Sequence, residues 1–222
     1  MPPHSFAEIK STVAKTGLMV RGGFFPAPED EVPDHPACLI LLGNAGPALW
    51  QKFNPAKPKG LDPLDTWTRH VVHELGETLG AKTLFPFDGP PYLPFQRWAQ
   101  RCEPVFPSPI GPLIHPTYGL WHAYRAALAF TDQIDLPGKE EQPHPCESCT
   151  DQPCLTTCPV EAFQPGHYDV PACVEFVTSK AGQSCLDQGC AARRACPVGQ
   201  DYLYEPAQAG FHMAAFAGSQ KP

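Results

Sequence analysis

The sequence predicts a domain of mixed structure, of the α/β or α+β class, followed by a small cysteine-rich domain. Helix and strand patterns alternate from the N-terminus to about residue 130, which is typical of such a first domain. Eight of the ten cysteines then lie between Cys146 and Cys196, after a proline-rich segment. We therefore expect a first domain over residues 1–137, a linker over 138–145, a cysteine-rich domain over 146–200 and a C-terminal tail over 201–222.

The first elements follow from local patterns near the N-terminus. Ser5 and Glu8 form a capping-box pattern that starts a helix, and Gly17 is a natural stop for it. Residues 18–25 predict a strand interrupted by a glycine pair. Residues 37–42 are continuously apolar, which indicates a strand that is covered on both faces.

A glycine turn before a short helix is expected directly after this buried strand. It contains Gly43, Asn44 and Gly46. Backbone N–H groups in a turn between a strand and a helix can bind a phosphate. Most such turns only change the direction of the chain, and both interpretations stay open here.

The best-defined helix of the first domain begins after Asp62 and ends at Gly80. Asp62 is a suitable N-cap residue, and the proline after it suits the first helical position. The expected apolar stripe consists of Leu64, Trp67, Val71, Leu75 and Leu79. His70 and His73 lie one turn apart and could bind a metal, but two partly solvated surface histidines are the more common case.

The remaining elements of the first domain are less distinct. Residues 82–87 predict a strand and residues 93–102 a helix. Residues 119–130 permit a helix by their alanines and a strand by their aromatic alternation. Cys38 and Cys102 lie far from the other cysteines, and we expect both to be small apolar core residues.

The cysteine spacing of the second domain is the most specific pattern in the sequence. Cys146, Cys149, Cys154 and Cys158 form a C-x2-C-x4-C-x3-C-P run, while Cys173, Cys185, Cys190 and Cys196 form a looser set that also ends in Cys-Pro. In the two-cluster bacterial ferredoxin pattern, the cysteine before proline ligates the other [4Fe-4S] cluster. This crossover predicts one cluster on Cys146, Cys149, Cys154 and Cys196, and another on Cys158, Cys173, Cys185 and Cys190.

Three other uses of these cysteines remain as alternatives. Disulfides require an oxidising compartment, yet the first 25 residues contain no pattern of an export signal. Structural zinc sites usually contain two C-x2-C pairs, whereas the second set of cysteines has none. A single [4Fe-4S] cluster with unused cysteines is the third alternative.

Composition and charge narrow the functional classes. The chain has 222 residues, of which 42% are hydrophobic, and it lacks an apolar run long enough to span a bilayer. Its 23 acidic and 16 basic residues give a net charge of −7, which argues against nucleic acid as the main partner. We expect a soluble cytoplasmic protein without a membrane partner.

Three stretches of the first domain resemble the cobalamin-processing CblC family. They are residues 39–50, the Asp62–Asp65 helix start and residues 115–125. The resemblance implies a strand over residues 119–130 and a bound corrinoid. The corrinoid-side residues that it implies are Gly43, Asn44, Gly46, His115, Tyr118, Trp121 and Arg125. The histidine-containing loop of that family should fall near residues 88–93, where this chain has no histidine.

The second domain resembles the C-terminal part of epoxyqueuosine reductases and reductive dehalogenases. Those enzymes join a nitroreductase-like, corrinoid-binding domain to two [4Fe-4S] clusters, in the same order as the parts of this chain. Their lone cysteine after an aspartate turn matches Asp169–Cys173. The resemblance implies a nitroreductase-like domain followed by a ferredoxin-like domain.

The leading functional hypothesis is an iron–sulfur oxidoreductase. It would pass electrons from a low-potential donor (ferredoxin, flavodoxin or flavoprotein reductase) through two [4Fe-4S] clusters to a corrinoid, a similar tetrapyrrole or a small-molecule substrate in the first domain. One alternative is a ferredoxin-like electron carrier or scaffold without a corrinoid. Another is a corrinoid-dependent reductase of a nucleoside or a halogenated substrate.

Overall fold

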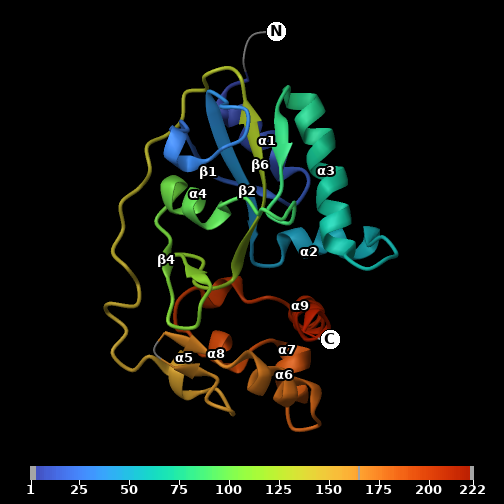
Figure 1. Ribbon diagram of the computed structural model, residues 1–222, viewed down its shortest axis with the longest axis vertical. Coiled ribbons are helices and arrows are strands. Elements are labelled where there is room, and N and C mark those ends of the chain that lie inside the picture. Colours follow the sequence, from blue (N-terminus) through green and yellow to red (C-terminus); the bar gives the residue numbers. More distant parts are fainter. Residues whose placement is uncertain (1–3, 165, 221–222) are drawn as a thin grey trace. The chain divides into compact units, whose positions relative to one another are not determined.

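The computed structural model describes residues 4–164 and 166–220, and these form two compact units. Unit 1 takes the described residues up to Pro104 together with His122–Glu141. Unit 2 takes Val105–Trp121 together with the described residues from Gln142 onward. The elements of both units are labelled in Figure 1. None of the described helices has the combination of length and apolar character that crossing a bilayer requires.

Unit 1 is built on a four-stranded sheet with the order β1-β2-β6-β3. The strands are β1 (Met19–Phe24), β2 (Cys38–Ala45), β3 (Lys82–Leu84) and β6 (His122–Phe130). All three pairings are antiparallel, so unit 1 belongs to the α+β alternative of the expected class. β2 is buried along almost its whole length because it lies between β1 and β6 with helices on both faces.

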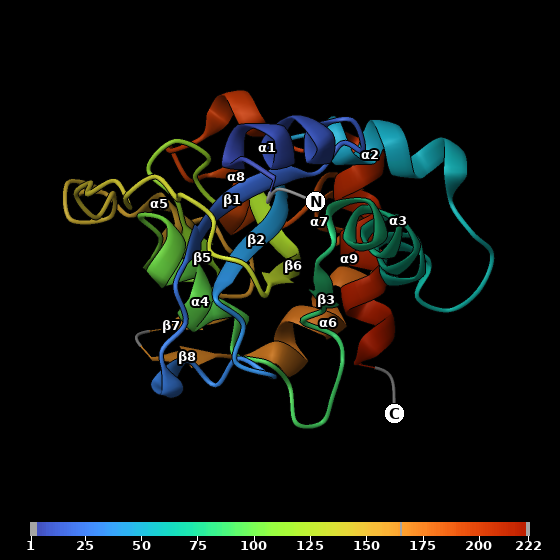
Figure 2. The ribbon, with the colours of Figure 1, turned by 90° about the horizontal axis from the view of Figure 1, so that it is seen from above.

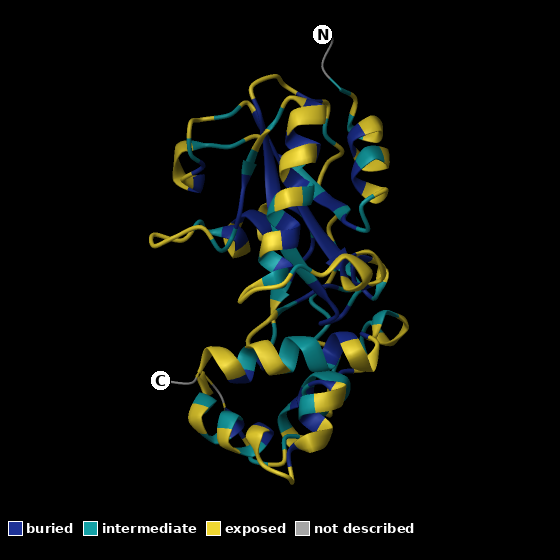
Figure 3. Ribbon diagram, turned by 90° about the vertical axis from the view of Figure 1, so that its right-hand side faces the viewer, coloured by how far each residue is buried: buried dark blue, intermediate teal, exposed yellow. Residues whose placement is uncertain are grey.

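Four helices cover this sheet. They are α1 (Phe6–Ala14), α2 (Ala48–Phe53), α3 (Pro63–Leu79) and α4 (Phe95–Cys102), with short 3-10 turns η1 (Pro28–Asp30) and η2 (Asn54–Ala56). Figure 2 shows α1 and α3 on one face of the sheet and α4 on the other. Figure 3 shows that buried residues concentrate in the strands and on the inner sides of these helices.

Several local predictions for unit 1 are confirmed. The Ser5 hydroxyl accepts a hydrogen bond from the Glu8 N–H (3.3 Å), and the Glu8 carboxylate accepts one from the Ser5 N–H (2.8 Å). α3 ends at Gly80, which adopts the left-handed conformation with φ +67°. Residues 122–130 form a strand, as the resemblance to the CblC family implied.

Other details of unit 1 differ from the prediction. Asp62 occupies the N-cap position of α3, but its side chain makes no capping hydrogen bond. Val72 is fully buried on α3, whereas the predicted stripe residue Val71 is only half-buried. β3 is half as long as predicted, because it is an edge strand paired with β6 only over Lys82–Leu84.

The predicted glycine turn after β2 is wrong in its extent. β2 continues through Ala45, and Gly43 and Asn44 pair with β6. Gly43 lies at an irregularity of this pairing, where a Cβ atom would lie 2.2 Å from the carbonyl oxygen of Ala123. Glycine is therefore required there by a close approach between strands. Of the three predicted turn residues, Gly46 alone lies outside the strand, with φ +60°.

Unit 2 consists of short elements. They are β4 (Phe106–Pro107), β5 (Leu113–Ile114), α5 (Pro153–Thr156), β7 (Phe163–Gln164), β8 (His167–Tyr168), α6 (Val170–Thr178), α7 (Gln183–Gln188), α8 (Ala191–Arg194), η3 (Gln200–Tyr202) and α9 (Pro206–Ser219). β4 pairs with β5, and β7 pairs with β8. The end of the chain, expected as a tail, is thus a helix whose residue Ala217 packs into a core cluster with Cys173 and Cys185.

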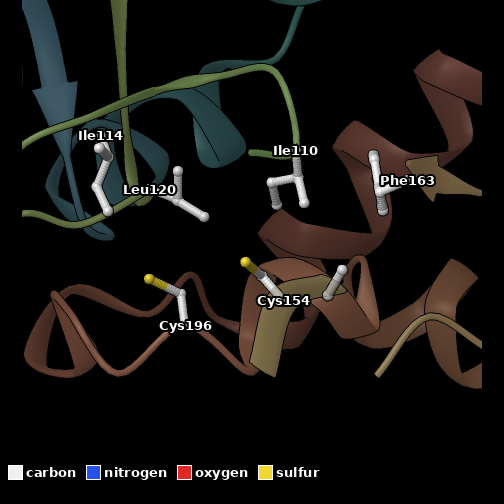
Figure 4. Packing of buried hydrophobic residues seen from close by; sticks show 7 residues of the cluster. Ile110, Ile114, Leu120, Cys154, Phe163 and Cys196 are labelled. Atoms are coloured by element: carbon white, nitrogen blue, oxygen red, sulfur yellow. The ribbon is translucent and has the colours of Figure 1, made fainter. Parts of the chain in front are cut away.

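Residues 105–121 belong to unit 2, although the expected boundary lay at residue 137. The reason is packing: Ile110, Ile114 and Leu120 share a buried cluster with Cys154 and Cys196. Figure 4 shows these three side chains across from the two cysteines, whose sulfur atoms lie on the side of the ribbon that faces them. The apolar residues of this segment therefore complete the core of the cysteine-rich unit.

Candidate functional site

All eight clustered cysteines lie in unit 2, and none of the ten cysteines forms a disulfide. Short helices position several of them. Cys154 lies on α5, Cys173 on α6 and Cys185 on α7, while Cys190 is the N-cap residue of α8. Asp169 starts α6 by accepting a hydrogen bond from the Ala172 N–H (3.0 Å), which fixes the helix that carries Cys173.

The eight cysteines line two separate pockets, four in each. The first pocket is lined by Cys146, Cys149, Cys154 and Cys196, and the second by Cys158, Cys173, Cys185 and Cys190. These are the same two sets that the crossover pattern predicts from the sequence. The last cysteine of each run thus faces the sulfurs of the other run.

Both pockets are small and mainly apolar. The first has about 300 Å³ of empty space, which includes its open side, and its lining includes Ile114, Pro109 and Val198. The second has about 310 Å³, and its lining includes Phe163 and Met213. Four sulfur donors in an apolar pocket are the ligand set that a [4Fe-4S] cluster takes. Across residues 4–164 and 166–220, no group of three or more His, Cys, Asp or Glu side chains has the geometry to hold a metal ion.

Burial controls the ionisation of these thiols. It raises the pKa of Cys146 to about 11, and the neighbouring thiols of Cys196, Cys154 and Cys149 contribute in the same direction. Burial also raises the pKa of Cys173. A thiolate at Cys146 or Cys173 would therefore need a positive partner, such as a metal ion.

Backbone N–H groups point at several of the sulfurs. The Ala162 N–H donates to Cys158 Sγ at 3.4 Å. Burial raises the pKa of Cys190, and hydrogen bonds from the Arg193 and Ala192 N–H groups partly offset that effect. N–H donors of this kind stabilise thiolate ligands and tune the potential of iron–sulfur clusters.

The residues predicted to face a corrinoid divide between the two units. Gly43, Asn44, Gly46 and Arg125 lie in unit 1, and His115, Tyr118 and Trp121 lie in unit 2. Neither unit by itself contains the whole set.

In unit 1, Arg125 connects two of the polar groups. Its Nε donates to the side-chain oxygen of Asn44 at 3.4 Å. Burial raises the pKa of the Asp65 carboxyl on α3, and the positive charge of Arg125 acts to lower it. The half-buried Arg125 thus belongs to a polar cluster with Asn44 and Asp65.

In unit 2, His115 and Tyr118 belong to a hydrogen-bonded turn, and Trp121 packs in the core. His115 Nδ1 accepts hydrogen bonds from the N–H groups of Thr117 (3.0 Å) and Tyr118 (3.3 Å), and its ring stacks on Tyr118 with centroids 4.4 Å apart. Trp121 is buried against Tyr204, with ring centroids 5.4 Å apart. These contacts hold residues 115–121 in place within unit 2.

A buried charged network in unit 1 was not predicted from the sequence. Arg21 on β1 is fully buried and forms an ion pair with Glu103 at 2.6 Å. Arg21 also donates to the carbonyl oxygen of Asn44 at 3.1 Å and lies 3.3 Å from His122 Nδ1. The Tyr124 hydroxyl donates to Glu103. An arginine in the middle of the apolar β1 pattern was the available indication of such a network.

The two histidines of α3 are surface residues, and the two cysteines outside the cysteine-rich domain are core residues, as expected from the sequence. His70 and His73 are exposed on α3, and His73 Nδ1 is paired with the Thr83 hydroxyl at 2.8 Å. Cys38 and Cys102 are buried in unit 1. Burial raises the pKa of the Cys38 thiol to about 11, so this cysteine remains a neutral core residue.

No family model and no curated protein matches this chain. Among solved structures, an epoxyqueuosine reductase crystallised with an epoxyqueuosine-modified tRNA-Tyr stem loop has 16% identity and a TM-score of 0.52, with 90% of this chain and 65% of that chain covered. Epoxyqueuosine reductase from Bacillus subtilis has 16% identity and a TM-score of 0.52, with coverage of 91% and 68%. The Streptococcus thermophilus enzyme has 15% identity and a TM-score of 0.50, with coverage of 87% and 66%.

At this level of identity the comparisons show a shared fold. The match includes both units, because it covers about nine tenths of this chain, and this chain spans 65% of the length of the first of those structures. The resemblance of the chain to the epoxyqueuosine reductase fold is therefore confirmed.

Proposed function

We propose that the chain is an iron–sulfur oxidoreductase whose unit 2 holds two [4Fe-4S] clusters. The observation that carries this proposal is the division of eight free cysteines into two apolar pockets of four. The crossover of the Cys-Pro cysteines supports it further, since two-cluster ferredoxins share their ligands in this way. The first cluster would be held by the Cys146 set and the second by the Cys158 set.

The chain's own residues prepare these pockets for low-potential electron transfer. Such clusters, when bound, exchange one electron each. Apolar side chains, with Ile114 in one pocket and Phe163 in the other, line the pockets beside the cysteines. The Ala162 N–H stabilises negative charge on Cys158. A low-potential donor, such as a ferredoxin, flavodoxin or flavoprotein reductase, would supply the electrons.

We further propose that unit 1 binds the electron acceptor, a corrinoid or a similar tetrapyrrole. The half-buried Arg125 and the buried Asn44 can donate hydrogen bonds to the polar groups of such a ligand, and the Asp65 carboxyl of the same polar cluster can accept them. Arg125 is well suited to this role because its planar guanidinium presents five donors.

A second candidate is the reduction of a modified nucleoside. It is favoured by the shared fold with epoxyqueuosine reductases, one of which was crystallised with a modified tRNA stem loop. The net charge of −7 would then require a local positive surface for RNA. Electron transport without any acceptor in unit 1 is the remaining alternative.

The proposal is tested on anaerobically purified full-length protein. We expect about eight iron and eight sulfide per chain, and transfer of electrons from a chemically reduced protein to added cob(II)alamin. A protein that contains iron and sulfide but does not reduce cobalamin would favour the function of an electron carrier. Reduction of an epoxyqueuosine-modified stem loop would favour the function of a nucleoside reductase. Absence of iron and sulfide after reconstitution would contradict the proposal.

Replacement of Arg125 by alanine should weaken the binding of cob(II)alamin about tenfold or more. A hydrogen bond from a charged group contributes about 1.5–3 kcal/mol, which corresponds to that factor in the dissociation constant. Titration followed by absorbance gives the affinity. Arg97→Ala, at an exposed arginine of the same unit, is the control. Unchanged affinity together with a lower melting temperature would show that Arg125 serves packing alone.

A further inference from the structure

The side chain of Arg193, on α8, is fixed by three neighbours within unit 2. Its Nε donates to the carbonyl oxygen of Leu120 at 3.0 Å, and its Nη2 donates to the same oxygen. Its guanidinium carbon lies 4.4 Å from the ring centroid of Trp121 and 4.8 Å from that of Tyr204. Both rings are buried, so the positive charge is held against a rigid aromatic surface whose ring faces attract a cation.

This charge lies on the helix that connects the two pockets. α8 occupies residues 191–194, between Cys190 of the second pocket and Cys196 of the first. The Arg193 N–H is hydrogen-bonded to Cys190. The residue to which its side chain is bound, Leu120, shares a buried cluster with Cys196. Arg193 is therefore bonded to Cys190 of the second pocket and to Leu120, which packs with Cys196 of the first pocket.

A fixed cation here acts on the redox equilibrium of a bound cluster. A cubane held by four thiolates carries net negative charge, which increases by one unit when the cluster accepts an electron. A positive charge that is shielded from water stabilises the reduced form more than the oxidised form. The adjacent Arg194 is half-buried as well, but its guanidinium is bound by the Gly189 carbonyl oxygen and by the exposed Gln188 and Ser184 side chains.

We infer that Arg193 is a positioning residue that raises the reduction potential of at least one of the two proposed clusters. The inference rests on the proposed function, because it requires clusters in the two pockets. The Trp121 and Tyr204 rings fix the position of the Arg193 guanidinium, and its positive charge stabilises the reduced form of the cluster. The electron comes from the external donor, and the cysteine ligands are unchanged by the step.

The test is a redox titration of full-length protein followed by electron paramagnetic resonance, with dithionite as the reductant. We expect Arg193→Met to keep its iron and to lower one midpoint potential by about 59 mV, which is a tenfold change in a one-electron equilibrium. Arg193→Lys, which keeps the charge, should remain within about threefold of the original equilibrium constant. Arg194→Met, which removes a charge from the same helix and leaves the contacts of Arg193 with Trp121 and Tyr204 in place, should do the same.

Three outcomes would overturn the inference. Arg193→Met with full iron and unchanged potentials would show that the charge has no effect, and an equal fall in Arg193→Lys would assign the effect to packing. If Arg193→Met loses iron, Tyr204→Leu gives the answer, because it keeps the cation but removes one ring that fixes it. A fall in potential in Tyr204→Leu supports the inference, and no fall overturns it. Absence of clusters from the unmutated protein would instead refute the proposed function.

Discussion

Removal of iron should unfold unit 2 while unit 1 keeps its structure. Two of the buried clusters of unit 2 contain Cys154 and Cys196 in one and Cys173 and Cys185 in the other, so the proposed ligands are themselves part of the core. Without iron, the pockets would be voids lined by unligated cysteines. Metal binding of this kind supplies folding free energy directly, because the site does not exist in the unfolded chain.

Hydrogen exchange measured before and after anaerobic chelation resolves the two units. We expect amide protection to disappear in α6, α7 and α9 and to persist in β2, β6 and α3. Retention of protection throughout unit 2 would show that its fold is independent of metal. Equal loss in both units would show that unit 1 depends on unit 2 for its stability.

Replacement of Glu103 by alanine should lower the free energy of unfolding by about 3–5 kcal/mol. The Arg21 side chain has no exposed surface, and that of Glu103 is 12% exposed. Removal of Glu103 leaves the charge of Arg21 buried without its carboxylate, and the Tyr124 hydroxyl loses its acceptor. Two other contacts of Arg21, with the Asn44 carbonyl oxygen and the His122 ring, carry no negative charge.

Denaturant unfolding followed through unit 1 gives the measured loss. The control is Arg97→Gln, which breaks an exposed ion pair with Glu31 and should cost about 0–1 kcal/mol. If Glu103→Ala lowers the free energy of unfolding by no more than the control does, water or a rearrangement must compensate the buried charge of Arg21. The network would then not be a main source of stability for the sheet.

Local patterns were sufficient for the elements that depend on near neighbours in the sequence. The capping box at Ser5, the apolar run of β2 and the helix from Pro63 all follow from residues within one element. The division of the cysteines into two sets also followed from spacing alone, because the position of a cysteine before proline is a local feature.

Features that depend on distant partners could not be derived in this way. Arg21 pairs with Glu103 and His122, which are 82 and 101 positions away. The segment 105–121 joins unit 2 because its apolar residues meet Cys154 and Cys196, and its two-residue strands are too short to give a periodic pattern. α9 was missed because its alanines and glycines give little contrast between faces.

The central claim, that the eight cysteines form two sets joined by crossover, is tested most directly by iron counts in two double variants. Each cluster contains four iron atoms, so loss of two ligands from one set should cost about four iron, and loss of one ligand from each set about eight. Cys154→Ala with Cys196→Ala should therefore retain about four iron per chain, whereas Cys190→Ala with Cys196→Ala should retain almost none. The opposite result, with iron kept in the second variant and lost from the first, would contradict the claim.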